Sequence, residues 1–138
     1  MPTTGAASYT GRVGADLTGG SDGSVLADVS LTATFSSGDV TGEIYNINVF
    51  DDSGAPDQKL KGKVPLSGNV LTNKMTASGS GKLTGVDSGF TGDSTASVIL
   101  NGQFRTNTAP ADTVTGTITG SGTGDFDFVL ANGKFYAE

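Results

Sequence analysis

Apolar and polar residues alternate through most of this chain, and this period of two constrains its fold more than any other feature. The segment SVLADVSLTATF (Ser24–Phe35) shows the alternation most clearly. One face of it collects Val25, Ala27, Val29, Leu31, Ala33 and Phe35, and the other collects Asp28, Ser30, Thr32 and Thr34. Because successive side chains of a β-strand point to opposite faces, the pattern predicts an antiparallel strand with one buried and one solvated face.

Similar segments follow along the chain. They cover Val40–Phe50, Lys59–Leu66, Asn69–Ser78 (with Leu71, Asn73, Met75 and Ala77 inward), Lys82–Val86, Ser94–Phe104, Thr113–Gly120 and Gly124–Glu138, the last with an Asn132–Gly133 turn signal. Within Val40–Phe50 the alternation slips by one residue, so that Tyr45 joins the next apolar set with Ile47 and Val49. A slip of this kind predicts a β-bulge near Tyr45–Asn46.

Short strands at regular spacing are typical of all-β barrels and sandwiches. The 22 glycines argue against long helices. Because closure removes exposed sheet edges, we expect a single closed antiparallel β-barrel of about eight strands, with little or no helix. One domain over residues 9–138 is expected behind a flexible lead over residues 1–8. Glycines inside strands are expected where the strands bend tightly, at Gly42, Gly62, Gly102 and Gly116.

The composition excludes several classes of function. The chain has no histidine and no cysteine, which excludes Ser–His and Cys–His nucleophiles. Its net charge of −6 argues against nucleic-acid binding, which needs a basic surface. The chain also lacks a run of about 18 apolar residues, the length of a transmembrane helix. We therefore expect no enzymatic activity, no cofactor and no transmembrane insertion.

Acidic residues gather in the polar loop DDSGAPDQ (Asp51–Gln58). Asp51, Asp52 and Asp57 offer enough oxygens for weak calcium binding, but their spacing differs from that of a calcium-binding helix–loop–helix, so no metal site is predicted. Asp125 and Asp127 share one strand face and are expected to be solvated rather than to form an acid–base pair. Haem ligation has only weak support, from Tyr9, Tyr45, Tyr136 and Met75.

Lysines follow one another on one face of the segment KLKGKVPL. Lys59, Lys61 and Lys63 are three of only eight basic residues in the chain. They could form a docking patch for an acidic partner. The alternative is protection against edge-to-edge aggregation, which lysines on an exposed strand also provide.

The interior of an eight-stranded barrel also allows two interpretations. Such a barrel is just wide enough to be filled by side chains or to hold one small ligand. The inward residues here are mostly aliphatic, which favours a packed core. A lipocalin-like pocket would require the small inward residues to leave a cavity instead of letting the barrel narrow.

Several motifs together resemble a known family. They are YTG near the start, ATFSSGDVTGEI in the first half, and FTGDSTASVILNGQF and TVTGTITGSG in the second half. From about Tyr9 to Phe135, the chain resembles the β-barrel domain of bacterial transferrin-binding protein B-like lipoproteins, a barrel that also occurs in factor H binding protein and in secreted haemophores. The family pattern of an aromatic–x–Gly turn, a strand ending in Gly-x-Phe and a last strand pair maps onto Phe90, Gly92, Ala96, Gly102, Phe104, Val114 and Gly116.

The resemblance implies an eight-stranded barrel that is exported, either to the bacterial cell surface as an outer-membrane lipoprotein or as a secreted protein. It also implies that the loops bind a partner. The lipidated cysteine of the family is missing, as expected if a lipid anchor is removed with a signal segment. The separate handle domain that often carries partner recognition is missing too, so transferrin is not carried over as a ligand.

The leading hypothesis is therefore a non-enzymatic, exported, monomeric binding module that recognises a protein or a metal or haem carrier. We expect the loops Asp51–Gln58 and Gly85–Asp93 to make the contact, the second with Phe90 and Asp93. The lysine strand would serve as an auxiliary patch. Two alternatives stay open: a lipocalin-like carrier of a small ligand, and a structural barrel that assists secretion without any ligand.

Overall fold

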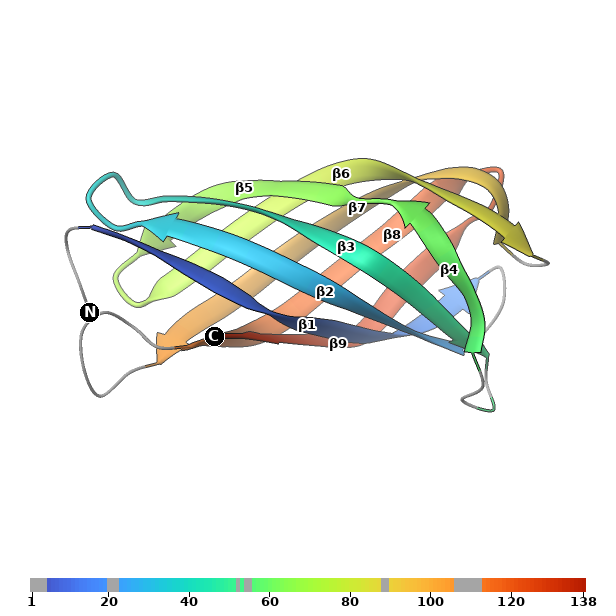
Figure 1. Cartoon of the computed structure of the whole chain (residues 1–138), viewed down its shortest axis with the longest axis horizontal. Coiled ribbons are helices and arrows are strands. Elements are labelled where there is room, and N and C mark those ends of the chain that lie inside the picture. The colour runs from blue at the N-terminus through green and yellow to red at the C-terminus, as the bar shows by residue number, and fades with distance from the viewer. Residues whose placement is uncertain (1–4, 20–22, 52, 54–55, 88–89, 106–112) are drawn as a thin grey trace.

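The computed structural model describes residues 5–19, 23–51, 53, 56–87, 90–105 and 113–138. It contains nine strands (Figure 1), which are β1 (Ala6–Gly19), β2 (Gly23–Thr34), β3 (Asp39–Asp51), β4 (Pro56–Gly62), β5 (Val64–Leu71), β6 (Lys74–Asp87), β7 (Phe90–Arg105), β8 (Thr113–Gly124) and β9 (Phe128–Ala137). Strand β1 begins inside the segment expected as a lead. Within the described ranges there is no helix long and apolar enough to cross a membrane.

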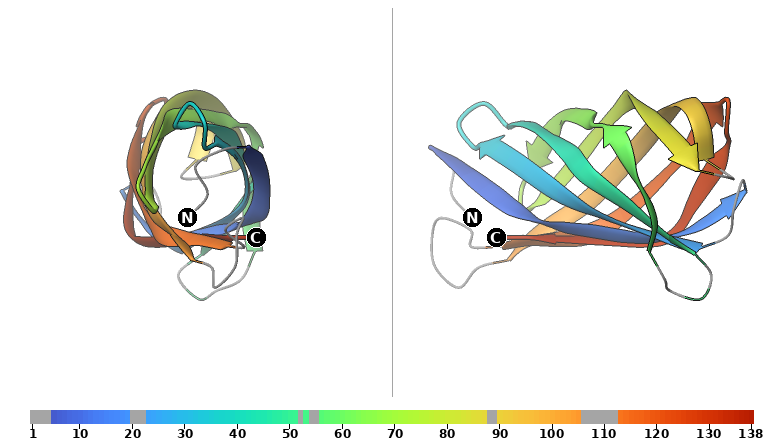
Figure 2. Two further views of the ribbon diagram at one scale, coloured as in Figure 1. Left: turned by 90° about the vertical axis from the view of Figure 1, so that its left-hand side faces the viewer. Right: turned by 45° about the vertical axis from the view of Figure 1, so that its right-hand side comes forward.

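The strands pair antiparallel around a closed ring. From β2 the ring passes through β1, β9, β8, β7 and β6, and β3 completes it by pairing with β2 on one side and with β4 and β5 on the other. Because β4 and β5 share one position between β3 and β6, the hydrogen bonds form a ring of eight. The left view of Figure 2 looks along the axis of the barrel, with the strands surrounding its interior. The predicted closed all-β barrel of about eight strands is confirmed.

A break divides the strand position that β4 and β5 share. Strand β4 pairs with residues 47–50 of β3, and β5 pairs with residues 39–44. Gly62, at the end of β4, has a φ of 113°, a conformation that side chains other than glycine rarely allow. A Cβ atom at this site would also overlap the carbonyl oxygen of Lys82 on β6. Gly62 therefore lets the chain kink while it stays against its neighbour.

A β-bulge lies in the middle of β3. The register between β2 and β3 shifts between Leu26 and Asp28, where β3 contributes an extra residue. Asn46 occupies this bulge with a φ of 52°. The bulge predicted near Tyr45–Asn46 is thus confirmed, but the inward orientation predicted for Tyr45 is wrong. The phase changes at Asn46, so Tyr45 still lies on the outer face and Ile47 is the first inward residue after the bulge.

Three assignments from the sequence are wrong. A turn at residues 72–73 divides the expected strand Asn69–Ser78 between β5 and β6, so Leu71 is 79% exposed and Asn73 lies in the turn instead of facing inward. Strand β6 then continues through Lys82–Val86, which was expected to be a separate strand. The Asn132–Gly133 signal marks a bulge inside β9, where Asn132 has a φ of 53°.

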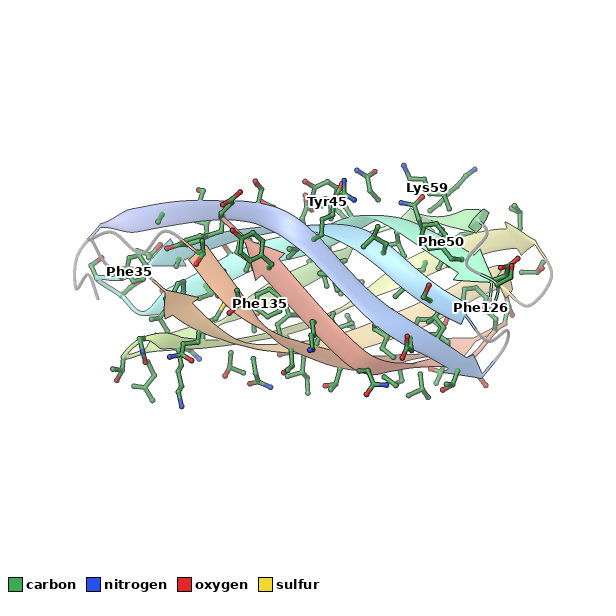
Figure 3. The ribbon with its side chains drawn as sticks, turned by 90° about the horizontal axis from the view of Figure 1, so that it is seen from below. Phe35, Tyr45, Phe50, Lys59, Phe126 and Phe135 are labelled. Carbon is green, nitrogen blue, oxygen red and sulfur yellow. The ribbon has the colours of Figure 1, made fainter. Side chains whose placement is uncertain are left out.

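Inward-facing apolar side chains fill the barrel. The end at which β1 begins and β9 ends, here called the termini end, is closed by three aromatic rings. The Phe104 ring lies 5.6 Å from the rings of both Tyr9 and Phe35, measured between centroids. Phe126 lies at the opposite end (Figure 3) and stacks on Phe128 at 6.0 Å. The barrel therefore has an apolar interior, with aromatic residues at both of its ends.

Several glycines inside strands lie where neighbouring chain segments approach too closely for a side chain. A Cβ atom at Gly42 would overlap the carbonyl oxygen of Ser30, and one at Gly116 would overlap that of Asn101. At Gly102 it would lie 2.7 Å from the ring of Phe135. These contacts explain the expected clustering of glycine at positions of tight bending.

Candidate binding surface

Strand β4 and the bulge of β3 together build a basic surface on the outside of the barrel. Leu60 and Val64 are buried, so the alternation of the strand sends Lys59, Lys61 and Lys63 into solvent. Tyr45 and Asn46 lie beside them on β3, and these five residues line a hollow next to the Gly62 kink. Figure 3 shows Tyr45 and Lys59 on the same outer side of the barrel. We call these five residues the lysine face.

Hydrogen bonds fix part of the lysine face. The Lys59 Nζ donates to the Asn46 side-chain oxygen at 3.0 Å, and the Asn46 amide nitrogen donates to an Asp28 carboxylate oxygen at 2.8 Å. The Lys63 ammonium lies 3.1 Å from the Glu43 carboxylate. Among the described residues, neither Lys59 nor Lys61 forms an ion pair. No described carboxylate therefore neutralises the charge of Lys59 or Lys61.

Sequence reasoning did not assign Tyr45 and Asn46 to a binding surface. The signal was the phase slip in Val40–Phe50, which predicted the bulge. A bulge turns the residue in it away from the regular alternation. At Asn46 this places the amide between strands β2 and β4, where it contacts both Asp28 and Lys59.

The acidic loop is only partly described. Asp51 ends β3, and its Oδ1 accepts hydrogen bonds from the backbone nitrogen and the hydroxyl of Ser53, at 3.0 and 2.6 Å. Asp52 and the side chains of Asp57 and Phe90 lie outside the described residues. Gly85–Asp93 is largely strand, because β6 ends at residue 87 and β7 begins at residue 90. The contact expected from these two loops stays a prediction.

Asp93 takes part in a local network across β6 and β7. Its carboxylate accepts a hydrogen bond from the Thr84 hydroxyl at 2.7 Å and lies 3.1 Å from the Lys82 ammonium. The hydrogen bond from Thr84 and then that from Lys82 lower the pKa of Asp93 below its ordinary value of 3.8. The Asp93 backbone nitrogen in turn donates to Asp125 Oδ2 at 3.0 Å. Asp93 therefore serves to join the β6–β7 pair to the connection between β8 and β9.

Asp125 and Asp127 each accept a bond from the backbone. Asp127 Oδ1 accepts from the Gly124 nitrogen at 3.1 Å, while Asp125 binds the nitrogen of Asp93. Both residues are exposed, as the sequence predicted. Their oxygens hold the β8–β9 connection in place and are not directed at each other by any hydrogen bond described here.

Metal and haem ligands are not brought together in the described part of the chain. No group of three Asp or Glu residues there lies close enough to hold a metal ion. Tyr9 and Met75 are each only 2% exposed and belong to the core. The Tyr136 hydroxyl donates to Glu138 at 2.8 Å, which raises the pKa of Tyr136. Of the three aspartates considered for weak calcium binding, Asp52 and the side chain of Asp57 lie outside the described residues, so that possibility stays untested.

The barrel interior is a packed core that retains a small cavity. The cavity has a volume of about 40 Å³ and is lined by aliphatic residues and Phe128. Pockets for drug-sized ligands hold roughly 300–1,000 Å³. The cavity is thus far smaller than a lipocalin-like calyx that encloses a large ligand.

Comparison of the chain with protein-family profiles, with curated proteins and with solved structures gave no match. The resemblance to transferrin-binding protein B-like barrels therefore rests on the residues quoted above and stays a prediction.

Proposed function

We propose that this protein is a non-enzymatic binding module whose lysine face recognises an acidic surface of a partner protein. The observation that carries the proposal is the concentration of Lys59, Lys61 and Lys63 on one strand of a chain with a net charge of −6. A basic patch on an acidic molecule orients an acidic partner toward one side, since the rest of the surface repels it. Export to the bacterial surface or medium, implied by the resemblance, remains part of the proposal.

The geometry adds a reason for docking, although protection against aggregation stays open as the alternative. Strand β4 pairs with β3 over residues 56–60 but with β6 only at Lys61 and Gly62, so part of its edge on the β6 side is not in the described ladder. Tyr45 supplies a partly buried ring beside the ammonium groups, and aromatic residues are enriched at protein interfaces.

The test is a titration with a hexaglutamate peptide, followed by backbone amide NMR. We expect shift changes to cluster on β4 and on residues 45–46 of β3, and to weaken with added salt. The double variant Lys59→Gln/Lys61→Gln should weaken binding about fivefold, because two exposed charge contacts contribute roughly 1 kcal/mol together.

The matched control is Lys74→Gln/Lys134→Gln, which removes two exposed lysines elsewhere and changes the net charge equally. It should leave the peptide affinity nearly unchanged. If both double variants weaken binding to the same extent, only the overall charge matters and the lysine face has no special role.

A further inference from the structure

The half of the barrel away from the termini contains an apolar cavity that the proposed function does not use. Its volume is about 40 Å³, and its lining includes Val25, Ala27, Leu60, Ala96, Ile118 and Phe128 from strands on all sides of the ring. Each of these side chains is less than a tenth exposed. The cavity thus lies among inward-facing side chains of the barrel and is partly enclosed by them.

Small side chains leave this space open. Ala27 on β2 and Ala96 on β7 both line the cavity, at positions where most other inward residues are Val, Leu or Ile. Near the termini end, by contrast, the space beside a small inward residue is filled, because the ring of Phe135 lies over Gly102. Among the described residues that line the cavity, Phe128 alone carries an aromatic ring, so no other ring of the lining fills the space beside Ala27 and Ala96.

Two aromatic residues lie beside the cavity at the end opposite the termini. Phe128 belongs to its lining, and its ring lies against Gly122 on β8, where a Cβ would overlap the ring atoms. Phe126 stacks on Phe128 from the β8–β9 connection. Hydrogen bonds from backbone nitrogens to Asp125 and Asp127 hold that connection. Phe126 on this connection and Phe128 at the start of β9 therefore lie apart from the lysine face.

The lining determines which ligand can bind. It exposes no polar atom to the cavity, and a buried water needs about two to four polar partners, so water gains nothing by entering. A charged or hydrogen-bonding group would lose its hydration without compensation. We propose that the barrel binds a small, uncharged, wholly apolar molecule in this cavity, with room for about three water-sized groups.

Xenon is the probe for this site, because it is small, uncharged and apolar. Crystals of the full chain under xenon pressure should show an anomalous peak between Ala27, Ala96 and Phe128. The variant Ala27→Leu places three further carbon atoms into the space and should abolish the peak. Ala7→Leu is the matched control, since Ala7 packs on the core at the termini end and does not line the cavity; it should retain the peak.

A second variant tests whether Phe128 forms a wall of the cavity. Phe128→Ala should enlarge the cavity, so that the variant binds benzene, observed as a rise in melting temperature, while the wild type shows none. A folded Phe128→Ala protein without such a rise would contradict the assignment of Phe128 as the wall. Absence of xenon from the wild-type cavity would overturn the proposal directly, whatever the variants do.

Discussion

The substitution Gly116→Ala tests whether close backbone approach is the reason for glycine inside these strands. Gly116 faces inward on β8, opposite Gly102 on β7. Its φ is not positive, so alanine could adopt the backbone conformation itself. The added methyl group, however, would overlap the carbonyl oxygen of Asn101 and lie 2.6 Å from the Cα of Gly102. Both are backbone atoms, so only a movement of β7 against β8 can relieve the overlap.

The expected loss in the free energy of unfolding follows from this displacement of β7 against β8. Displacing the strands weakens about two ladder hydrogen bonds, each worth roughly 1 kcal/mol net. Overpacking of a well-filled interior adds about 1 kcal/mol or more. The lower entropy of the unfolded alanine chain returns about 0.4–1 kcal/mol. We therefore expect Gly116→Ala to lower the free energy of unfolding by about 2–3 kcal/mol, within the range of a severe single substitution.

Urea denaturation followed by circular dichroism measures this change. With a slope of about 2 kcal/mol per molar urea, the midpoint should fall by about 1–1.5 M. Gly14→Ala is the matched control, because a Cβ there would meet only Val25 and Leu26 atoms at 3.9 Å. It should be neutral or stabilise by up to about 1 kcal/mol. Equal midpoints for the two variants would refute the explanation by close approach.

Two further predictions concern polar residues. Because the pKa of Asp93 is lowered in the folded state, its contribution to stability is fully present above its ordinary value of 3.8 and is lost as the pH falls through the lowered value. The variant Asp93→Asn should thus be less stable than the wild type near neutral pH, with the difference shrinking in urea titrations toward pH 2. At the bulge, Asn46→Val should cost about 1–2 kcal/mol more than Asn46→Gly in thermal denaturation, since a β-branched side chain is strained at a φ of 52°. Similar melting temperatures for the two Asn46 variants would count against strain at this position.

Much of the barrel could be predicted because its strands obey the period of two. The buried residues from Val25 to Ala33 alternate as the sequence indicated, and the slip before Ile47 located the bulge. The turn at residues 72–73 was missed for a physical reason. Thr72 takes a φ of 59° there, a conformation for which Thr carries no sequence signal. Conversely, Asn132 supports positive φ in a bulge as well as in a turn, so the dipeptide alone could not distinguish the two.

The binding surface could be predicted less completely. The exposure of Lys59, Lys61 and Lys63 followed from alternation alone, because each is flanked by residues that belong inside or at the kink. The place of Asn46 beside Lys59 depends on the pairing of β3 with β4, which no local pattern specifies. The same holds for Asp93, whose contacts with Thr84 and then Lys82 span the β6–β7 pair and lower the pKa of Asp93.

The seam between β1 and β9 carries a consequence for how the chain reaches its final shape. Gly11 pairs with Ala137, so the circle joins segments from the two extremes of the sequence. Until β9 has been made, the edges of β1 and β8 that pair with β9 keep unpaired backbone hydrogen-bonding groups. Unpaired strand edges can pair with other chains, and strand pairings between segments this distant in sequence form slowly. The barrel is therefore most vulnerable to aggregation before β9 has paired with β1 and β8.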